Sequence, residues 1–397
     1  MLSDCFERAV RFDGSVQDLQ TRSTEIPSGR GVLLFADAED RPIQLLVAAN
    51  LRRTARVRLT APETDQPSRR ARLAGLARCV YFRLACCEFQ AHWDCLRIAR
   101  HLYPDSYTDW ISLPALHLVQ IDLSAPWPRF APTSRPGFQP LSDRPGRRVF
   151  GPFPSHRACL DLIDIQTRSF DLCRKPNLID SADRAGNCPY LQMGSCPAPC
   201  VGKLGRTEYL ERLAMACGIA DGSGAIVRRL LEDQMRTCAR ELQFEHAERL
   251  KQAIADILKI ENSDARWSGD LSGLMLLHID RSATIPGPDK KKKVQSFAAF
   301  VFHAGRILRR PDFTVDQVPS LLESLHPLQS RQGGAGDTPA GDSLARLEDP
   351  LSPGLLADLL ALFSFFLFRR SAPGLWCNCS PHLPDRDKLI ESVSSLG

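Results

Sequence analysis

Four cysteines near the middle of the chain constrain its fold more than any other feature. Cys173, Cys188, Cys196 and Cys200 follow the spacing C-x14-C-x7-C-x3-C, with prolines and glycines among the last two. Prolines stiffen that loop, and glycines permit tight turns beside it. Structural zinc sites usually pair their ligands as C-x2–4-C at both ends, and only the second pair fits. One tight pair with two more distant members suits an iron–sulfur cluster. The spacing predicts a metal site of either kind, and four unrelated buried thiols are the alternative.

Length and composition set the broad class. A chain of 397 residues is too long for one ordinary core and predicts two to four modules. Its 43% hydrophobic and 24% charged residues are typical of soluble globular proteins, and its net charge of +5 is compatible with nucleic acid. Fourteen cysteines without a visible secretory signal argue against a disulfide scaffold. We therefore expect a cytoplasmic protein.

Hydrophobic periodicity predicts a multidomain α+β fold. Residues 24–60 have the pattern of a strand hairpin that leads into a helix, and residues 84–102 have helical spacing. Residues 224–260 predict two antiparallel helices with a turn at Gln243 and Phe244. Residues 272–315 are strand-like again. The apolar run 359–368 has ten residues, too few to span a bilayer, and predicts a buried helix or strand.

Three segments resemble the UvrC family, the incision subunit of bacterial nucleotide excision repair. The cysteine segment CPYLQMGSCPAPCVGKLGRTEYLERL is similar to the family pattern C-L-x-x-x-I-G-x-C-x-x-P-C-V-G followed by E-Y. Upstream, RRVFGPFPSHRACLDLIDI resembles the family's Y-F-G-P-Y segment. Downstream, ELQFEHAERLKQAI resembles the UVR motif L-E-F-E-x-A-A-x-x-R-D. The segments occur in the family's order. The resemblance covers roughly residues 28–320 and is strongest from 147 to 260.

The resemblance implies a cofactor and a partner. It implies that the four cysteines ligate a [4Fe–4S] cluster, with zinc as the alternative. It also implies that the helical hairpin pairs with a UvrB-like protein, and the residues that would carry this contact are Phe244, Ala247, Leu250 and Ile254. The alternative is that these residues only hold the hairpin shut. A two-helix hairpin this short does not bury its apolar face alone, which favours a partner.

The same resemblance places a GIY-YIG nuclease domain at the N-terminus, but its chemistry is missing. That chemistry uses two tyrosines, an arginine and a glutamate that binds a divalent cation. Leu33, Gln44, Thr54 and Cys95 stand at those positions here. We therefore predict no catalytic residues and expect no Mg²⁺. Glu88 and Asp94 are the carboxylates near enough in sequence to replace the lost metal ligand, although the tyrosines would still be missing.

These interpretations give a provisional map of the chain. It has a degenerate GIY-YIG-like α/β domain at 24–104, connecting strands and loop at 105–165, a cysteine module at 166–204, a helical region with the UVR hairpin at 205–265, and a mixed α/β segment at 266–397. In the last segment we expect no RNase H-like nuclease domain. Basic side chains predicted to contact DNA phosphates are Arg52, Arg53, Arg56, Arg147 and Arg148.

Three functions remain open from the sequence. The first is a non-catalytic, DNA-associated adaptor of excision repair. The second is a divergent excinuclease subunit that still incises DNA. The third is a UVR-type interaction module of a stress complex without a DNA role. The missing tyrosines and glutamate weigh against the second, and the basic groups favour the first over the third.

Overall fold

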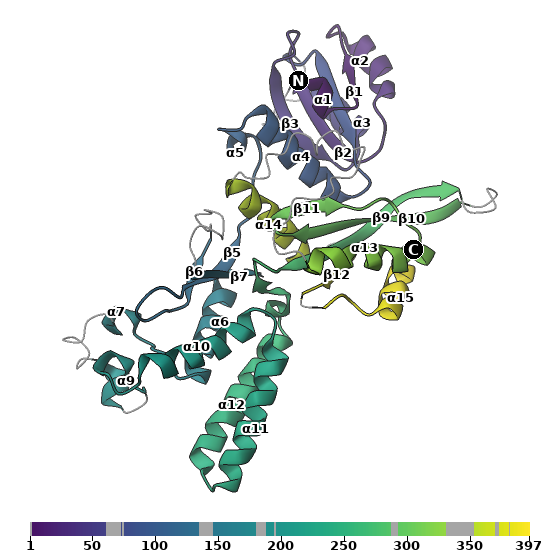
Figure 1. The fold of residues 1–397 in the computed structure, drawn as a ribbon. Helices are drawn as coiled ribbons and strands as arrows, with labels where there is room; N and C mark the ends of the chain where they lie inside the picture. The colour runs from purple at the N-terminus through teal and green to yellow at the C-terminus, as the bar shows by residue number, and fades with distance from the viewer. Residues whose placement is uncertain are drawn as a thin grey trace.

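The computed structural model describes most of the chain and confirms the α+β class (Figure 1). The described residues are 2–60, 73, 75–134, 146–179, 188–193, 196–286, 293–330, 353–369, 373–380 and 382–397. Within them lie three antiparallel sheets of four strands each, in the orders β1-β4-β2-β3, β6-β5-β7-β8 and β11-β10-β9-β12. Each sheet organises one body of the protein. No helix among these residues is both long and apolar enough to cross a membrane.

The N-terminal body is a sheet with helices on both faces. Its central strand β2, GVLLFA, is buried along its whole length and pairs with β3 and β4. A Cβ on Gly31 would lie 1.9 Å from the Arg83 carbonyl oxygen, so only glycine fits there. The helix that the sequence predicted after the hairpin is present, and Asn50 caps it by accepting the Arg53 N–H. The elements are α1 (Leu2–Cys5), β1 (Arg8–Arg11), α2 (Val16–Arg22), η1 (Ser23–Glu25), β2 (Gly31–Ala36), β3 (Pro42–Ala48), α3 (Leu51–Leu59), β4 (Cys79–Leu84), α4 (Glu88–Leu102) and α5 (Tyr107–Trp110).

The middle body combines the second sheet with the cysteine segment and the long helices. Its core lies where β5 and β7 meet α6, α10 and the base of the α11–α12 hairpin. Tyr209 is fully buried there, and its hydroxyl donates to the Pro128 carbonyl. The elements are β5 (His117–Asp122), β6 (Ala131–Thr133), β7 (Arg147–Phe153), α6 (His156–Ser169), α7 (Pro176–Ile179), α9 (Pro189–Gln192), η3 (Pro199–Val201), α10 (Arg206–Ala220), α11 (Gly224–Arg240), α12 (Phe244–Glu261), η4 (Asp264–Trp267) and β8 (Gly269–Asp270).

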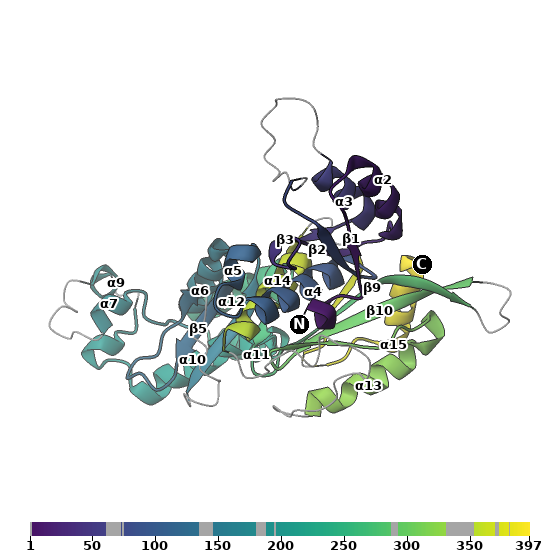
Figure 2. The same ribbon diagram turned by 90° about the horizontal axis from the view of Figure 1, so that it is seen from above.

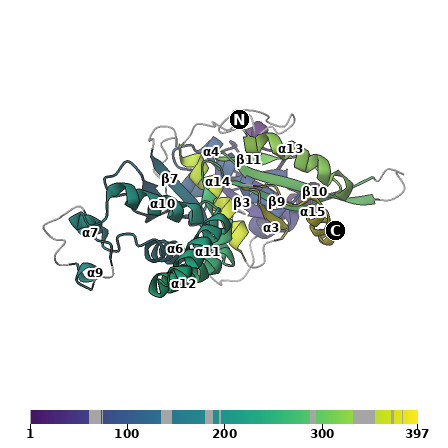
Figure 3. The same cartoon turned by 60° about the horizontal axis from the view of Figure 1, so that its bottom comes forward.

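The two antiparallel helices predicted between 224 and 260 are present as α11 and α12. Their apolar positions Leu231, Leu250 and Ile257 are buried and belong to the core that α6 and α10 share. Other parts of the same chain therefore bury the apolar face of the hairpin. This corrects the reasoning from length alone, which required a partner protein. The tip of the hairpin projects away from the rest of the molecule (Figures 1 and 3).

The C-terminal body is a sheet with helices on opposite faces (Figure 2). One face carries α13 and α15 over Leu277, Ile279 and Val301, and the other carries α14 over Phe300 and Phe302. Successive residues of a strand point to opposite faces, so one strand serves both cores. The elements are β9 (Met275–Pro286), β10 (Lys293–His303), β11 (Arg306–Arg309), η5 (Val315–Gln317), α13 (Val318–Ser330), α14 (Pro353–Phe368), β12 (Leu375–Asn378) and α15 (Arg386–Leu396).

Helix α14 fills the seam between the first and third bodies. It contains the ten-residue apolar run, and its Phe363 packs against Phe89 of α4 and against Trp376 of β12. At its first turns, Asp358 accepts hydrogen bonds from Arg100 and from the Tyr107 hydroxyl, both at 2.6 Å. The run is thus a buried helix, as the sequence predicted, and it joins segments more than 250 residues apart in the chain.

The packing of α14 in this seam predicts that two of its phenylalanines contribute differently to the free energy of unfolding. Phe363 is fully buried, whereas 42% of the Phe365 side chain is exposed. Phe363→Ala should lower the free energy of unfolding by about 3–5 kcal/mol, because it leaves a cavity between three packed elements. Phe365→Ala should change it by only about 0.5 kcal/mol. Urea denaturation followed by tryptophan fluorescence measures both, since Trp376 contacts Phe363. Equal losses for the two variants would contradict this assignment of the seam.

Candidate functional site

The positions expected to carry nuclease chemistry lie in an apolar core. Leu33 on β2 is fully buried and packs with Leu51 and Ala55 of α3. Gln44 lies opposite Phe35 in the β2–β3 pair, and its Oε1 is buried with no hydrogen-bond partner among the described residues. Thr54 is half-buried on α3. These three positions share the α3 side of the sheet, where apolar packing replaces ionisable groups.

Cys95 lies on the other side of that sheet. It belongs to α4 and packs with Val32 and Leu34, the neighbours of Leu33 that point to the opposite face. Burial, together with the nearby Asp94 carboxylate, raises the pKa of its thiol to about 12. A protonated, buried thiol is a poor ligand for a hard divalent cation. The sheet therefore separates Cys95 from Leu33, and the four positions do not form one site.

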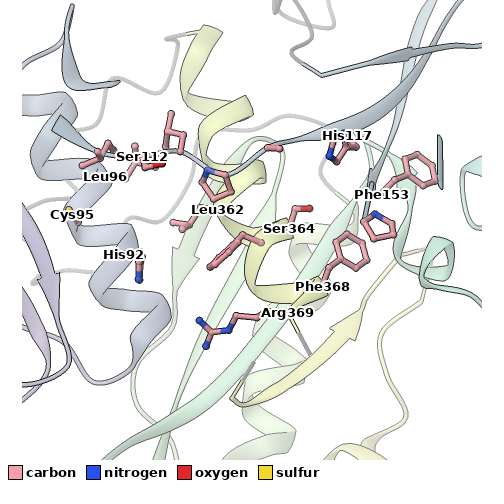
Figure 4. A pocket seen from close by; sticks show the side chains of 16 residues that line it. His92, Cys95, Leu96, Ser112, His117, Phe153, Leu362, Ser364, Phe368 and Arg369 are labelled. Atoms are coloured by element: carbon pink, nitrogen blue, oxygen red, sulfur yellow. The ribbon is translucent and has the colours of Figure 1, made fainter. Parts of the chain in front are cut away.

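The two carboxylates near Cys95 are already engaged. Both Glu88 oxygens accept from the Arg369 guanidinium, at 2.7 and 2.9 Å. This pairing holds the pKa of Glu88 below its usual range. Asp94 is buried and lies 3.4 Å from the Arg83 Nε and 3.5 Å from the Arg97 Nη1. Each carboxylate thus neutralises an arginine, which leaves little negative charge for a metal ion. Arg369, the partner of Glu88, also lines a cavity of about 600 Å³ near α4 and α14 (Figure 4).

The cysteine module gathers its four thiols into one region of the middle body. Cys173 follows α6, Cys188 precedes α9, and Cys196 and Cys200 lie before and within η3. Burial raises the pKa of the Cys173 thiol to about 11, and the other three cysteines add to the effect through their negative charge. The thiols are therefore within electrostatic reach of each other. No three His, Cys, Asp or Glu side chains in the described part of the chain are grouped closely enough to hold a metal ion.

The local backbone suits sulfur ligands. Ala198 has a left-handed conformation at φ 59°, which turns its N–H toward the Cys196 sulfur at 3.4 Å. An N–H of Lys175 likewise bonds to the Cys173 sulfur and lowers its pKa, against the larger effect of burial. N–H groups directed at sulfur stabilise thiolates and are used to tune iron–sulfur sites. The donor chemistry therefore fits a four-thiolate centre, whereas the sulfur positions do not form a closed ligand shell.

The arginines predicted to contact DNA differ in whether their side chains already have hydrogen-bond partners within the protein. Arg52 donates to the Ile26 and Thr24 carbonyls, and Arg56 donates to the Ser23 hydroxyl. These two side chains hold the segment before β2. Arg53, in the same helix, is exposed and has no side-chain partner among the described residues. Of these three arginines, Arg53 is therefore the one whose guanidinium is most available to a ligand.

The other two predicted arginines lie at the sheet of the middle body. Arg147 donates to the Gln120 side chain. Arg148 donates to Asp270 at 2.7 Å and to Asp221 at 3.2 Å, so two carboxylates balance its charge. Arg148 ties β7 to β8 and to the end of α10, which is a structural role that its place in the sequence did not indicate.

Only part of the predicted hairpin surface is open to a partner. Phe244 is 65% exposed at the tip, whereas Leu250 is buried and Ala247 and Ile254 are half-buried against the middle core. Leu242, which the sequence reasoning missed, is 72% exposed and has φ 62°, a strained conformation for a residue with a side chain. Leu242 lies in the turn between α11 and α12, where no core is near enough to bury an apolar side chain. A large apolar residue at such a turn is the sequence signal that could have identified it.

Comparison with known proteins shows which proteins this chain is similar to. Residues 120–218 match the model of the UvrC/Cho excinuclease middle domain, a stretch that contains all four cysteines of the module. This chain is UvrC-like. UvrABC system protein C from Ruminiclostridium cellulolyticum is 26% identical over 67% of this chain and 43% of its own length. The protein of the same name from Acidothermus cellulolyticus is 30% identical, over 57% and 35% respectively. A third, from Syntrophus aciditrophicus, is 26% identical over 61% and 38%.

These matches cover only part of each relative, which limits what can be inferred from them about this chain. The matched region spans between a third and a half of the length of each of these relatives. No solved structure matches this one. The UvrC-like assignment therefore rests on the middle domain and on the sequence around it.

The Glu88–Arg369 pair predicts a pH-dependent contribution to stability. Glu88→Gln should destabilise the protein by about 1–2 kcal/mol at pH 7, because a charge-assisted bidentate pair is lost. Since the pKa of Glu88 is lowered in the folded protein, the stabilisation is complete above the unfolded value of about 4.3 and disappears as the pH falls through the folded value. Urea unfolding at pH 7 and below pH 4 measures the difference between wild type and variant.

The exposed pair of Glu248 and Lys251 provides the control. Glu248→Gln should have almost no effect at either pH, because solvent screens that pair. A Glu88→Gln effect that is the same at both pH values would contradict the assignment.

Proposed function

We propose that this protein is a non-catalytic, DNA-associated adaptor of nucleotide excision repair that binds a UvrB-like partner through the tip of its helical hairpin. The observation that carries this proposal is the exposure of Leu242 and Phe244, two large apolar side chains at the end of a projecting hairpin. Large apolar groups that cluster at an exposed tip are characteristic of contact anchors. The backbone strain at Leu242 adds support, because strain that does nothing for the chain's own core is typical of functional positions.

The adaptor role, rather than incision, is supported by the N-terminal body. A nuclease of the GIY-YIG type hydrolyses a phosphodiester with a positioned metal ion and groups that move protons. Here the equivalent positions are held by Leu33, Gln44, Thr54 and Cys95, on two sides of a sheet, and the nearest carboxylates pair with arginines. An incision assay on lesion-bearing duplex with UvrA, UvrB and Mg²⁺ tests this directly. Nicks that depend on this chain would replace the adaptor role by an excinuclease role.

The proposal includes a [4Fe–4S] cluster held by Cys173, Cys188, Cys196 and Cys200. When bound, such a cluster with four protein ligands supplies structural cross-linking or electron transfer, because no iron is left open to substrate. Support comes from the spacing of the thiols, from their shared region, and from the N–H groups directed at Cys173 and Cys196. The chain's own contribution is to hold four thiolates around turns at Ala198 and Gly202.

The partner contact predicts a selective loss of binding. Leu242→Ser combined with Phe244→Ser should weaken the complex with UvrB by about 100-fold or more, because each anchor is worth about 2 kcal/mol at a contact centre. Ile226→Ser is the matched control, since Ile226 is also apolar, exposed and on the hairpin, but lies at its base. Isothermal titration calorimetry measures all three proteins. Unchanged affinity for the double variant would remove the hairpin tip from the partner contact.

The cluster predicts a metal content and a colour. Protein purified without oxygen should be brown and contain about four irons and four sulfides per chain. Cys196→Ala should lose the iron, whereas Cys86→Ala, which changes a half-buried cysteine outside the module, should retain it. Iron and sulfide assays with visible spectroscopy measure this. A colourless protein with bound zinc would favour the zinc alternative, and a protein without either metal would contradict the metal site.

A further inference from the structure

A cleft of about 640 Å³ lies between the cysteine module and the helical hairpin. We call it the arginine cleft, because Arg168, Arg174, Arg212 and Arg249 line it together with Cys196 and Pro197. The four arginines come from the end of α6, the segment after it, α10 and α12. Figures 1 and 3 show these elements gathered at the base of the hairpin. The volume is typical of ligand-binding clefts.

The charges in the arginine cleft do not cancel. Its lining has two carboxylates, Asp171 and Asp256, against four guanidinium groups. Asp171 lies 3.7 Å from Arg212, which also pairs with Glu208 at 2.8 Å. Asp256 lies 3.8 Å from Arg168, which also pairs with Asp164 at 3.0 Å. Asp256 is also held by Lys259 at 2.7 Å, which removes part of its charge from the cleft. Carboxylates therefore balance Arg168 and Arg212, and the excess of positive charge in the lining comes from Arg174 and Arg249.

Two of the arginines have no carboxylate partner among the residues that the structure describes. Arg249 projects from the exposed face of α12. Arg174 is half-buried, with its guanidinium over the Tyr190 ring at 5.1 Å from the ring centre. An aromatic ring leaves the N–H donors at the edge of a guanidinium free for another acceptor. The uncompensated charge is therefore contributed from both walls, the cysteine module and the hairpin.

A hydroxyl group completes the set of donors. Ser169 lines the same cleft, and its Oγ is buried without a hydrogen-bond partner among the described residues. Buried hydroxyl groups normally have a partner, so this one indicates a missing acceptor. A ligand of this cleft must bring negative charge and several acceptor oxygens. Phosphate groups have both properties, and arginine matches their geometry.

We propose that the arginine cleft binds the phosphates of a nucleic-acid strand. The inference rests on the proposed association with DNA and names the surface responsible for it. Cations from four separate segments suit several linked phosphates better than one isolated anion. None of these four residues belongs to the arginines that the sequence suggested. A strand in this cleft touches the cysteine module and the hairpin together, so nucleic-acid binding fixes these two parts relative to each other.

The test is the salt dependence of binding to a fluorescein-labelled, lesion-free single-stranded DNA oligonucleotide, measured by anisotropy on the full chain. Each lost phosphate contact with a single strand lowers the slope of log Kd against log salt concentration by about 0.7. Arg249→Gln should therefore lower the slope by about 0.7 and weaken binding about four-fold at physiological salt. Arg174→Gln combined with Arg249→Gln should lower the slope by about 1.4. Arg240→Gln removes the same charge from the exposed last turn of α11, outside the cleft, and should change neither quantity.

A second measurement does not depend on variants. Bound oligonucleotide should protect Arg174 and Arg249 from phenylglyoxal, but not Arg240, as mass spectrometry of the modified peptides would record. Steep salt dependence in the wild type with no change in Arg249→Gln and no protection would overturn the cleft assignment and leave DNA association intact. Absence of any salt-dependent binding by the wild type would overturn both. Protection together with the lower slope would establish the site.

Discussion

The packing of α14 between α4 and the C-terminal sheet is the contact on which the arrangement of this protein depends. Its apolar side chains have aromatic partners on both sides, and buried or partly buried ion pairs fix its two ends, Asp358 with Arg100 and Arg369 with Glu88. Removing one member of such a pair leaves an uncompensated charge in a poorly solvated place. The helix therefore sets the position of the N-terminal body on the rest of the chain.

This seam also bears on the proposal that the N-terminal body does not act as a nuclease. A metal-dependent active site needs α4 to present carboxylates to solvent and substrate. In this protein Glu88 at the start of α4 is paired with α14, and Cys95 further along is covered by strand residues. In the adaptor role proposed above, this face of α4 holds two bodies together and does not present a metal site.

Local patterns in the sequence predicted the local structure well. The β2–β3 hairpin, the two antiparallel helices and the apolar run 359–368 follow from strand or helix periodicity and from turn residues within each segment. Contacts between segments that lie far apart in the chain produce no comparable pattern in the local sequence. Nothing in the neighbourhood of Arg148 indicates its partners Asp221 and Asp270, and Glu88 finds Arg369 at a separation of 281 residues. For the same reason the cysteine module could be found from its spacing, whereas the arginine cleft, assembled from residues between 168 and 249, could not.

The anchoring of the helical hairpin has a geometric implication. Its base is part of the middle core through Leu231 and Ile257, while its tip stands clear of the molecule. Helix α12 has 18 residues, which at the usual rise per residue is a rod about 27 Å long. A rod fixed at one end and free at the other behaves as a spacer. If the two proposals above hold, a partner bound at Leu242 and Phe244 is kept in a fixed orientation relative to the arginine cleft, because the first turns of α12 line that cleft.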